Sequence, residues 1–224
     1  MHNFPVETQQ IENLPHGLDL IVNRRLASSF SRAAPFFVHM LGVPGAGKSV
    51  IARMLYGTIT SWLPEAPSYV GFDRLMAEIP AYQDTPDIVE AFAKYELPAR
   101  AAGYALLKEL ISKRASIFLD HGGSAAEHPE ILRLAKRQFG YRIYVVSVEV
   151  DNDICQSRIE ARAKAEGRHT PPDYISERAL QIEEMVPEYT DISDQFFAFK
   201  NNTQSDLVKI VTDQSLKAAS IISS

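Results

Sequence analysis

The segment that most constrains the fold is an apolar run, Phe36–Leu41, which leads directly into a glycine-rich octapeptide of sequence GVPGAGKS at positions 42–49. The pattern G-x-x-x-x-G-K-S between a strand and a helix is typical of a phosphate-binding loop, whose successive backbone N–H groups point at phosphate oxygens. Glycines are needed because the backbone approaches the ligand closely and takes up positive φ angles. The segment Val50–Tyr56 predicts the helix that follows, and the dipole at its N-terminus favours a bound phosphate.

The motif also predicts what individual residues do. Lys48 is expected to reach the β and γ phosphates, and the hydroxyl of Ser49 to ligate Mg²⁺. We therefore predict a site for ATP with Mg²⁺ formed by Gly42, Pro44, Gly45, Ala46, Gly47, Lys48, Ser49 and Val50. Two alternatives stand beside this interpretation: a chance match in a glycine-rich turn, and a degenerate loop that binds a nucleotide without turning it over.

Length and charge limit the class of protein. A chain of 224 residues suits one domain with at most a small appendage. The net charge of −5 argues against a nucleic-acid partner bound over the whole surface, although a local basic groove is compatible with it. Cys155 is the only cysteine, which excludes an intramolecular disulfide and fits a reducing compartment. With neither a secretory signal nor a membrane-spanning run, we expect a cytoplasmic protein without a membrane partner.

Apolar strands alternate with helical segments along the chain. Strands are predicted at 36–41, 69–73, 117–120, 142–150 and 195–199. Helices are predicted at 13–29, 50–56, 74–78, 84–114 with a break near Pro98, 129–139, 153–166, 173–185 and 204–222. The alternation predicts an α/β, P-loop NTPase fold with three layers, in which helices flank a mostly parallel central sheet, and an arginine-bearing lid. We expect an N-terminal helical extension at 1–34 and a P-loop kinase domain at 35–224, with the lid at about 153–172.

Two carboxylates follow predicted strands, at the edge where parallel sheets bind ligands. Asp73 is the candidate general base that would accept a proton from an acceptor hydroxyl, although an aspartate there also suits the N-cap of the next helix. Asp120 has the position of an acid that holds Mg²⁺ directly or through water. His121 is a candidate substrate contact, with a structural hydrogen bond as the alternative.

Basic residues gather after the fourth predicted strand. The candidates for stabilising charge during phosphoryl transfer are Arg158, Arg162, Lys164, Arg168 and His169. A mobile lid is one interpretation, and a solvated helix with ion pairs to Glu160 and Glu166 is the other. The pair Asn201–Asn202 could lie near the base of a nucleotide or form a polar turn.

Four segments together resemble the zeta-toxin-like P-loop kinases over roughly residues 36–202. They are GVPGAGKS, VGFDRLMAEIPAY, FLDHGG and RIEARAKAEGRHTPPDYI. The resemblance implies a kinase that uses ATP and Mg²⁺ to phosphorylate a hydroxyl of a small molecule, which for the toxins is a UDP-activated amino sugar. It also implies that Asp73 is catalytic, that Lys48 and Ser49 bind the phosphates, and that the lid arginines are Arg158 with Arg162 or Arg168.

The acceptor side departs from the family pattern. Where the toxins carry a stretch similar to Glu-Gly-Thr-Gly-Arg, this chain has Asp120–Ser124, so the acid is shorter and the arginine is absent. No counterpart of the family's substrate-binding glutamate stands in the preceding helix, where the sequence is Ala101–Leu106. Asp120, His121 and Arg168 are therefore the substrate residues expected from the sequence, with Ser49 and Asp120 as the metal ligands.

The leading hypothesis is an ATP-dependent kinase acting on a small-molecule hydroxyl, which includes a nucleotide-sugar. Catalysis would rest on Lys48, Asp73, Arg158 and Arg162. The alternatives are a polynucleotide 5′-hydroxyl kinase and a non-enzymatic nucleotide-dependent switch. The acidic balance and the lack of an aromatic–basic stripe disfavour a nucleic-acid partner. A protein partner similar to an antitoxin is a further hypothesis, and nothing in the residues tests it.

Overall fold

A parallel five-stranded sheet forms the centre of the molecule in the computed structural model, which describes residues 4–166 and 172–203. The strands are β1 (Phe36–Leu41), β2 (Ser68–Gly71), β3 (Ile117–Asp120), β4 (Arg142–Glu149) and β5 (Gln195–Lys200). They lie in the order β2-β3-β1-β4-β5, and every neighbouring pair is parallel. The phosphate-loop strand β1 is therefore central, and the predicted α/β fold with a parallel sheet is confirmed.

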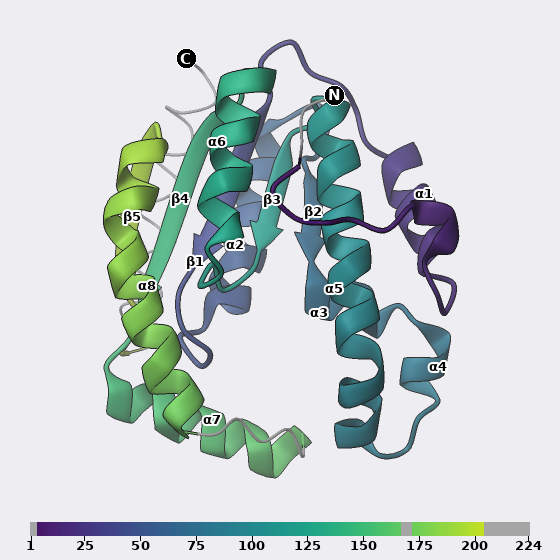
Figure 1. The fold of residues 1–224 in the computed structure, drawn as a ribbon. Helices are drawn as coiled ribbons and strands as arrows, with labels where there is room; N and C mark the ends of the chain where they lie inside the picture. Colours follow the sequence, from purple (N-terminus) through teal and green to yellow (C-terminus); the bar gives the residue numbers. More distant parts are fainter. Residues whose placement is uncertain (1–3, 167–171, 204–224) are drawn as a thin grey trace.

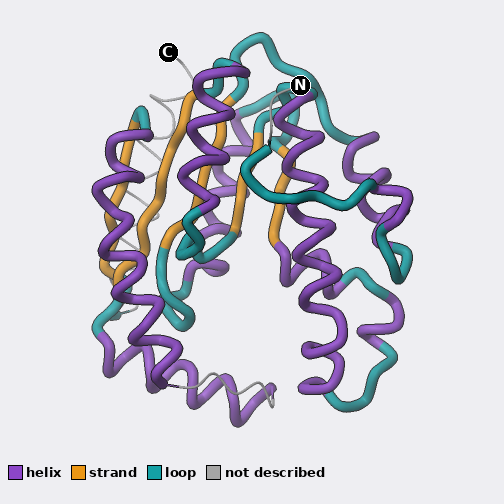
Figure 2. Tube along the Cα trace, viewed as in Figure 1, coloured by secondary structure: helices purple, strands orange, loops and turns teal. Residues whose placement is uncertain are grey.

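Helices cover both faces of this sheet (Figures 1 and 2). They are η1 (Ile11–Asn13), α1 (Leu18–Ala27), α2 (Lys48–Trp62), α3 (Phe72–Ala77), α4 (Pro80–Gln83), α5 (Ile88–Ser112), α6 (Glu127–Phe139), α7 (Asn152–Glu166) and α8 (Pro172–Ile192). Figure 1 shows α5, α6 and α8 in front of the sheet, α2 behind it, and α7 below the edge where the strands end. Parallel strands joined by helical crossovers produce this three-layer arrangement.

The alternation of side chains along β1 explains the two cores. Phe37 and Leu41 point into the larger core, which α1, α5 and α6 help to form. Val38 and Met40 point to the opposite face, where they pack with Ile51 and other side chains of α2. Successive residues of a strand face opposite sides of the sheet, so an apolar strand of this kind is buried on both.

Several element boundaries differ from the sequence prediction. Helix α5 runs without a break from Ile88 to Ser112 and contains Pro98, where we predicted a kink. It begins at Ile88 because Asp87 caps it, accepting hydrogen bonds from the backbone N–H groups of Val89 and Glu90. The buried residues on either side of Pro98, such as Tyr95 and Ala102, keep the helix in the core and offset the lost backbone bond.

Strand β2 is also shorter than predicted. It ends at Gly71, so Asp73 lies in the first turn of α3 and not at the end of a strand. Helix α2 begins at Lys48 and reaches Trp62, well beyond the predicted end at Tyr56. The helix predicted at 204–222 lies outside the described residues. Among the residues that are described, none of the helices has both the length and the apolar character needed to cross a bilayer.

Candidate phosphate-transfer site

The phosphate loop has the backbone geometry that its sequence predicts. Gly45 and Gly47 have φ angles of 84° and 86°, which are favourable for glycine and strained for other residues. Gly47 is the N-cap of α2, so the loop ends at the positive end of a 15-residue helix. The amine of Lys48 turns back over the loop and donates a hydrogen bond of 2.7 Å to the carbonyl of Val43. The loop is thus closed by its own side chain and backbone.

Residues from distant segments hold the outside of this loop. The side-chain amide of Asn201, just after β5, donates to the carbonyl of Ala46 at 2.7 Å, and the residue is buried. The thiol of Cys155 in α7 donates to the carbonyl of Pro44 at 2.7 Å. The sequence left two roles for Asn201, a contact with the nucleotide base or a place in a polar turn. The structure shows it bonded to the phosphate loop. Asn202 instead exchanges hydrogen bonds with Asp151 ahead of α7.

Arg158 of α7 lies directly beside the loop. Its Nη1 atom is buried without a hydrogen-bond partner among the described residues, and it would lie 4.0 Å from a Cβ placed on Gly47. Burial raises the pKa of the Cys155 thiol, while the positive charges of Lys48 and Arg158 act on it in the opposite direction. Two cations therefore converge on the phosphate loop from different elements. The side chain of Arg162 and the whole of Arg168 and His169 lie outside what the structure describes.

One of the two predicted acids lies at a strand end, and the other follows two residues after the end of the neighbouring strand. Asp120 is the last residue of β3 and is the parallel neighbour of Gly71 at the end of β2. One of its carboxylate oxygens accepts a 2.7 Å hydrogen bond from the hydroxyl of Tyr69. Burial is the main cause that raises the pKa of Tyr69, and the charge of Asp120 adds to it, so this hydroxyl stays a donor.

Asp73 is exposed in the first turn of α3. The N-cap of that helix is Gly71, and it makes no side-chain capping bond, so the interpretation of Asp73 as an N-cap is wrong. The helix starts earlier than predicted because Phe72 turns inward into the core, with its ring 5.0 Å from that of Tyr104. The side chain of Asp73 is therefore on the exposed side of α3, two residues after the end of β2.

Ser49 and Asp120 carry the oxygen donors expected of a magnesium site. Ser49 is exposed in the first turn of α2, and Asp120 is partly exposed. Hard oxygen ligands of this kind suit Mg²⁺, which usually keeps several waters and takes further ligands from substrate phosphates. Within residues 4–166 and 172–203 no group of three or more His, Cys, Asp or Glu side chains could hold a metal ion. A metal here would therefore depend on the nucleotide for part of its coordination.

Behind Asp120 lies a buried cluster that the sequence analysis missed. In it, Nε2 of His39 on β1 lies 2.9 Å from Nδ1 of His128 on α6, and the hydroxyl of Tyr104 lies 3.1 Å from the other nitrogen of His128. The ring of His121 stacks on His128 at 4.4 Å. We define His39, His121, His128 and Tyr104 as the histidine cluster. The one signal in the sequence was a histidine inside the otherwise apolar strand β1.

The histidine cluster is neutral and supports the loop after β3. Burial is the main cause that holds the pKa of His39 and of His121 well below its usual value, and it lowers the pKa of His128 to about 4. Nδ1 of His121 accepts a 3.2 Å hydrogen bond from the backbone N–H of Gly123, which matches the structural alternative for this residue. The carbonyl of Gly123 in turn accepts a 2.6 Å hydrogen bond from Tyr189 of α8.

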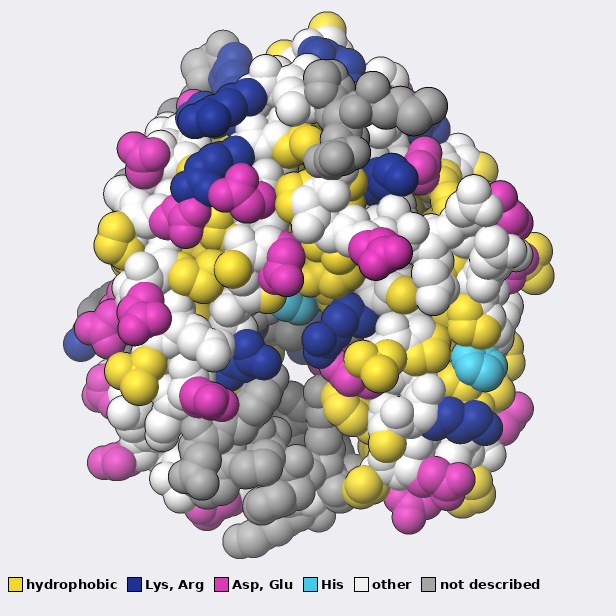
Figure 3. Space-filling model, viewed as in Figure 1, with side chains coloured by type: hydrophobic (Ala, Val, Ile, Leu, Met, Phe, Trp, Pro, Cys, Tyr) yellow, Lys and Arg dark blue, Asp and Glu magenta, His cyan; other side chains and the backbone are white. Residues whose placement is uncertain are grey.

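Basic side chains surround the same loop. The positive charges of Lys48 and Arg100 are among the lesser causes that lower the pKa of His121, after burial and the other two histidines. Arg178 of α8 donates a 3.1 Å hydrogen bond to the hydroxyl of Ser124. Figure 3 shows a hollow on this face, with a histidine side chain at its back and Lys or Arg side chains at its margins. Arg100 and Arg178 were not among the predicted site residues, since neither belongs to a motif recognised in the sequence.

Sequence comparison identifies the family. The sequence profile of the Zeta toxin family matches residues 22–219, which confirms the resemblance seen in the motifs. No curated protein matches the sequence significantly.

Solved structures with the same fold include toxins and kinases. A protein from the PezAT chromosomal toxin–antitoxin system of Streptococcus pneumoniae has a TM-score of 0.62 at 12% identity, over 96% of this chain and 99% of that one. A gluconokinase from Sinorhizobium meliloti 1021 has a TM-score of 0.51 at 16% identity, over 85% and 95% of the two chains. A shikimate kinase from Acinetobacter baumannii in complex with shikimate also reaches 0.51, at 17% identity over 84% and 95%.

The family match covers most of the sequence, and it includes the phosphate loop, Asp73, Asp120 and Arg158. The similar structures show the same kinase fold over nearly their whole lengths. The chain therefore belongs to the Zeta toxin family and is a P-loop kinase-like phosphotransferase.

Proposed function

We propose that this protein transfers the γ-phosphate of ATP to a hydroxyl group of a small molecule. The observation that carries the proposal is the buried Nη1 of Arg158, which has no partner among the described residues and lies against Gly47 at the entrance to α2. A buried guanidinium nitrogen is costly to leave unpaired, and a phosphate held by the loop would supply the missing acceptor. The same contact would stabilise the charge that develops during phosphoryl transfer.

The donor end is assigned to the phosphate loop. Its backbone N–H groups and Lys48 would bind the phosphates of ATP, and Ser49 with Asp120 would hold Mg²⁺ beside them. When bound, the metal neutralises phosphate charge. Arg162 and Arg168 keep their proposed places in a lid at about residues 153–172 of a kinase domain that spans 35–224.

Asp73 is proposed as the general base. Asp73 lies in the first turn of α3, two residues after the end of β2, and its carboxylate would accept the proton of the acceptor hydroxyl as the oxygen attacks the γ-phosphorus and ADP leaves. The acceptor would bind between α3 and the loop His121–Ser124. A nucleotide-sugar is one candidate acceptor, and the toxin–antitoxin neighbour makes a protein antitoxin a partner to test for.

The direct test supplies the protein with ATP labelled on the γ-phosphate and a pool of metabolites, and then identifies the labelled product. Asp73→Asn should lower transfer by about 100- to 10,000-fold, the usual contribution of a general base. Binding of a fluorescent ATP analogue should be unchanged. Asp84→Asn is the matched control, because Asp84 is also an exposed aspartate but lies at the end of α4. Full transfer by Asp73→Asn would remove Asp73 from the mechanism, and an unlabelled pool with a labelled oligonucleotide would favour the polynucleotide kinase.

A further inference from the structure

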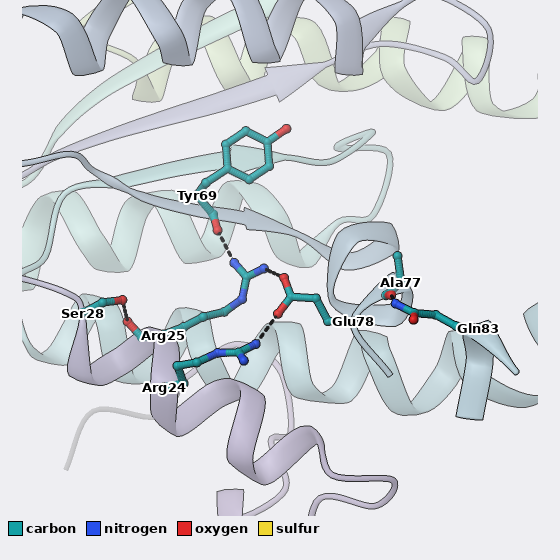
Figure 4. Close-up of polar contacts among 7 residues, drawn as sticks. All are labelled: Arg24, Arg25, Ser28, Tyr69, Ala77, Glu78 and Gln83. Carbon is teal, nitrogen blue, oxygen red and sulfur yellow. Dashed lines mark hydrogen bonds and ion pairs between the residues drawn. The ribbon is translucent and has the colours of Figure 1, made fainter. Parts of the chain in front are cut away.

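Arg25, near the end of α1, connects the N-terminal helix to the segment that carries Asp73. One guanidinium nitrogen donates a 2.9 Å hydrogen bond to the carbonyl of Tyr69 in β2, and the other pairs with the carboxylate of Glu78 (Figure 4). Tyr69 precedes α3, and Glu78 is its C-cap residue. A single side chain therefore holds the chain on both sides of this helix.

The helix between these two contacts needs external support. Helix α3 has only six residues, and helices this short are not stable on their own in water. The inner face of the helix is held by Phe72, Leu75 and Met76, all buried in the core. Asp73 and Arg74 lie on the exposed side of the helix. The contacts of Arg25 fix the two ends of the segment 69–78 and so limit how far Asp73 can shift.

Arg25 is also connected to Asp120, the second acid of the site, through Tyr69. Tyr69 accepts the hydrogen bond of Arg25 through its backbone carbonyl, and its side-chain hydroxyl donates to Asp120. Asp120 is thus connected to Arg25 through Tyr69, and Tyr69 stands four positions before Asp73 in the chain. The N-terminal helix lies on the far side of this segment from the phosphate loop, so its role is to support the segment and not to touch ligand.

Burial distinguishes Arg25 from its neighbour. The side chain of Arg25 is 18% exposed, whereas that of Arg24, which binds the other oxygen of Glu78 at 2.8 Å, is 69% exposed. The Nε atom of Arg25 is buried and has no hydrogen bond among the described residues. Removing a guanidinium from water and leaving one N–H unpaired is unfavourable, so a packed apolar side chain would serve stability as well.

We propose that Arg25 is a positioning residue, which keeps Asp73 in line with the phosphate bound at the loop. The proposal rests on the proposed role of Asp73 as general base. It gives the N-terminal helix a part in the reaction, since misplacing a reacting group by about 1 Å lowers turnover by about 100-fold. Arg24 shares Glu78 with Arg25 but makes no hydrogen bond to β2 among the described residues, and it provides a matched control.

The test uses the full chain and release of labelled phosphate from γ-labelled ATP with water as acceptor. Arg25→Gln should lower kcat by about 10- to 100-fold, with the Kd of a fluorescent ATP analogue within about twofold of the parent value. Arg24→Gln should leave both unchanged. Hydrogen exchange of the backbone amides at 69–78 should rise in Arg25→Gln and not in Arg24→Gln. Equal effects of the two variants on kcat would overturn the proposal.

A double-mutant cycle with Asp73→Asn separates positioning from general destabilisation. If Arg25 acts through Asp73, adding Arg25→Gln to Asp73→Asn should lower kcat little further. If the fold-losses in kcat of the two single variants instead multiply in the double variant, Arg25 acts independently of Asp73. If Asp73→Asn alone has no effect on hydrolysis or transfer, the proposed function fails first. Should Arg25→Gln not fold, Arg25→Lys keeps the charge beside Glu78 but cannot span both partners, and a kcat equal to the parent's would likewise overturn the proposal.

Discussion

The phosphate loop and the loop after β3 lie at the same edge of the sheet but are held in different ways. The phosphate loop takes its shape from its own glycines, from Lys48 closing onto Val43 and from the start of α2, and Asn201 and Cys155 add hydrogen bonds to two of its carbonyls from outside. The loop His121–Ser124 is held by side chains from two distant helices, namely His128 of α6 and Arg178 and Tyr189 of α8, with His39 of β1 behind them. The two loops touch through a 3.2 Å backbone hydrogen bond from Gly42 to Gly122.

This difference bears on how binding of ATP and binding of the acceptor would be separated in the proposed reaction. A loop shaped by its own backbone is transferable between kinases, because every nucleoside triphosphate presents the same phosphates. The loop after β3 is held by the histidine cluster, whose residues are not part of the phosphate-loop motif. The proposed donor end thus rests on geometry that the motif itself specifies, while the proposed acceptor end depends on side chains from distant parts of the chain.

The largest effect is expected from changing the phosphate loop at Gly47. In Gly47→Ala the new Cβ would come within 2.4 Å of the buried amide of Asn201, at a φ of 86°. Strain and the displaced amide should raise the Kd of ATP by about 100-fold or more, equivalent to about 3 kcal/mol. Isothermal titration with ATP measures this change. Gly57→Ala is the control, because a Cβ there meets nothing within 4 Å and binding should be unaffected.

The second-largest effect is expected from a change in the loop His121–Ser124, which should leave the phosphate loop intact. In Gly123→Ala the Cβ would come within 2.7 Å of both His39 and Leu41, and the φ of 71° is unfavourable for alanine. We expect a loss of about 3 kcal/mol in the free energy of unfolding from strain and overpacking. Urea unfolding measures it. Binding of ATP should stay within about threefold, since the phosphate loop is shaped locally.

Gly122→Ala provides the control for Gly123→Ala. A Cβ on Gly122 would meet only the carbonyl of Gly42, at an ordinary 3.6 Å. A loss of ATP binding in Gly123→Ala as large as that in Gly47→Ala would contradict the separation of the two loops.

The smallest effect comes from pH and tests the histidine cluster. The pKa of His128 is about 4 in the folded protein against 6.5 for an exposed histidine. Between these values the unfolded chain binds a proton that the folded protein does not, so the stability is complete above pH 6.5 and falls as the pH drops. His128 alone should remove about 2 kcal/mol of unfolding free energy between pH 6.5 and 5.

His39 and His121, whose pKa values are also lowered, add to the pH effect in the same direction. Urea unfolding at pH 7, 6 and 5 measures the slope, and His128→Asn should make it shallower. A slope that is the same with and without His128 would show that the cluster does not titrate on unfolding.

The elements near the motif could be predicted, and those shaped by distant contacts could not. The strand Phe36–Leu41 and the glycine turns follow from local rules, and the structure has them at the predicted places. The length of α5 through Pro98 and the early start of α3 at Phe72 depend on burial against other helices. Periodicity and turn residues carry no information about such packing.

The candidate site divides in the same way. Lys48, Asp73, Asp120 and Arg158 all stand in or beside recognisable patterns, and the structure brings Lys48 and Arg158 to one loop. Asn201 was named without a definite role, because a polar pair after a strand does not reveal that it bonds to Ala46, 155 positions away. The chemical roles of Lys48, Asp73, Asp120 and Arg158 remain predictions.

The sequence by itself determined that this chain folds as a P-loop kinase of the Zeta toxin family and where its phosphate loop lies. Those properties depend on backbone geometry within a few residues, which glycines, a lysine and a serine specify directly. Only the tertiary structure decided that His39, His128 and Tyr104 support the loop after β3 and that Arg25 of α1 holds both ends of the segment 69–78. Contacts between residues so far apart depend on strand order and helix packing, and these arise only when the whole chain folds around one sheet.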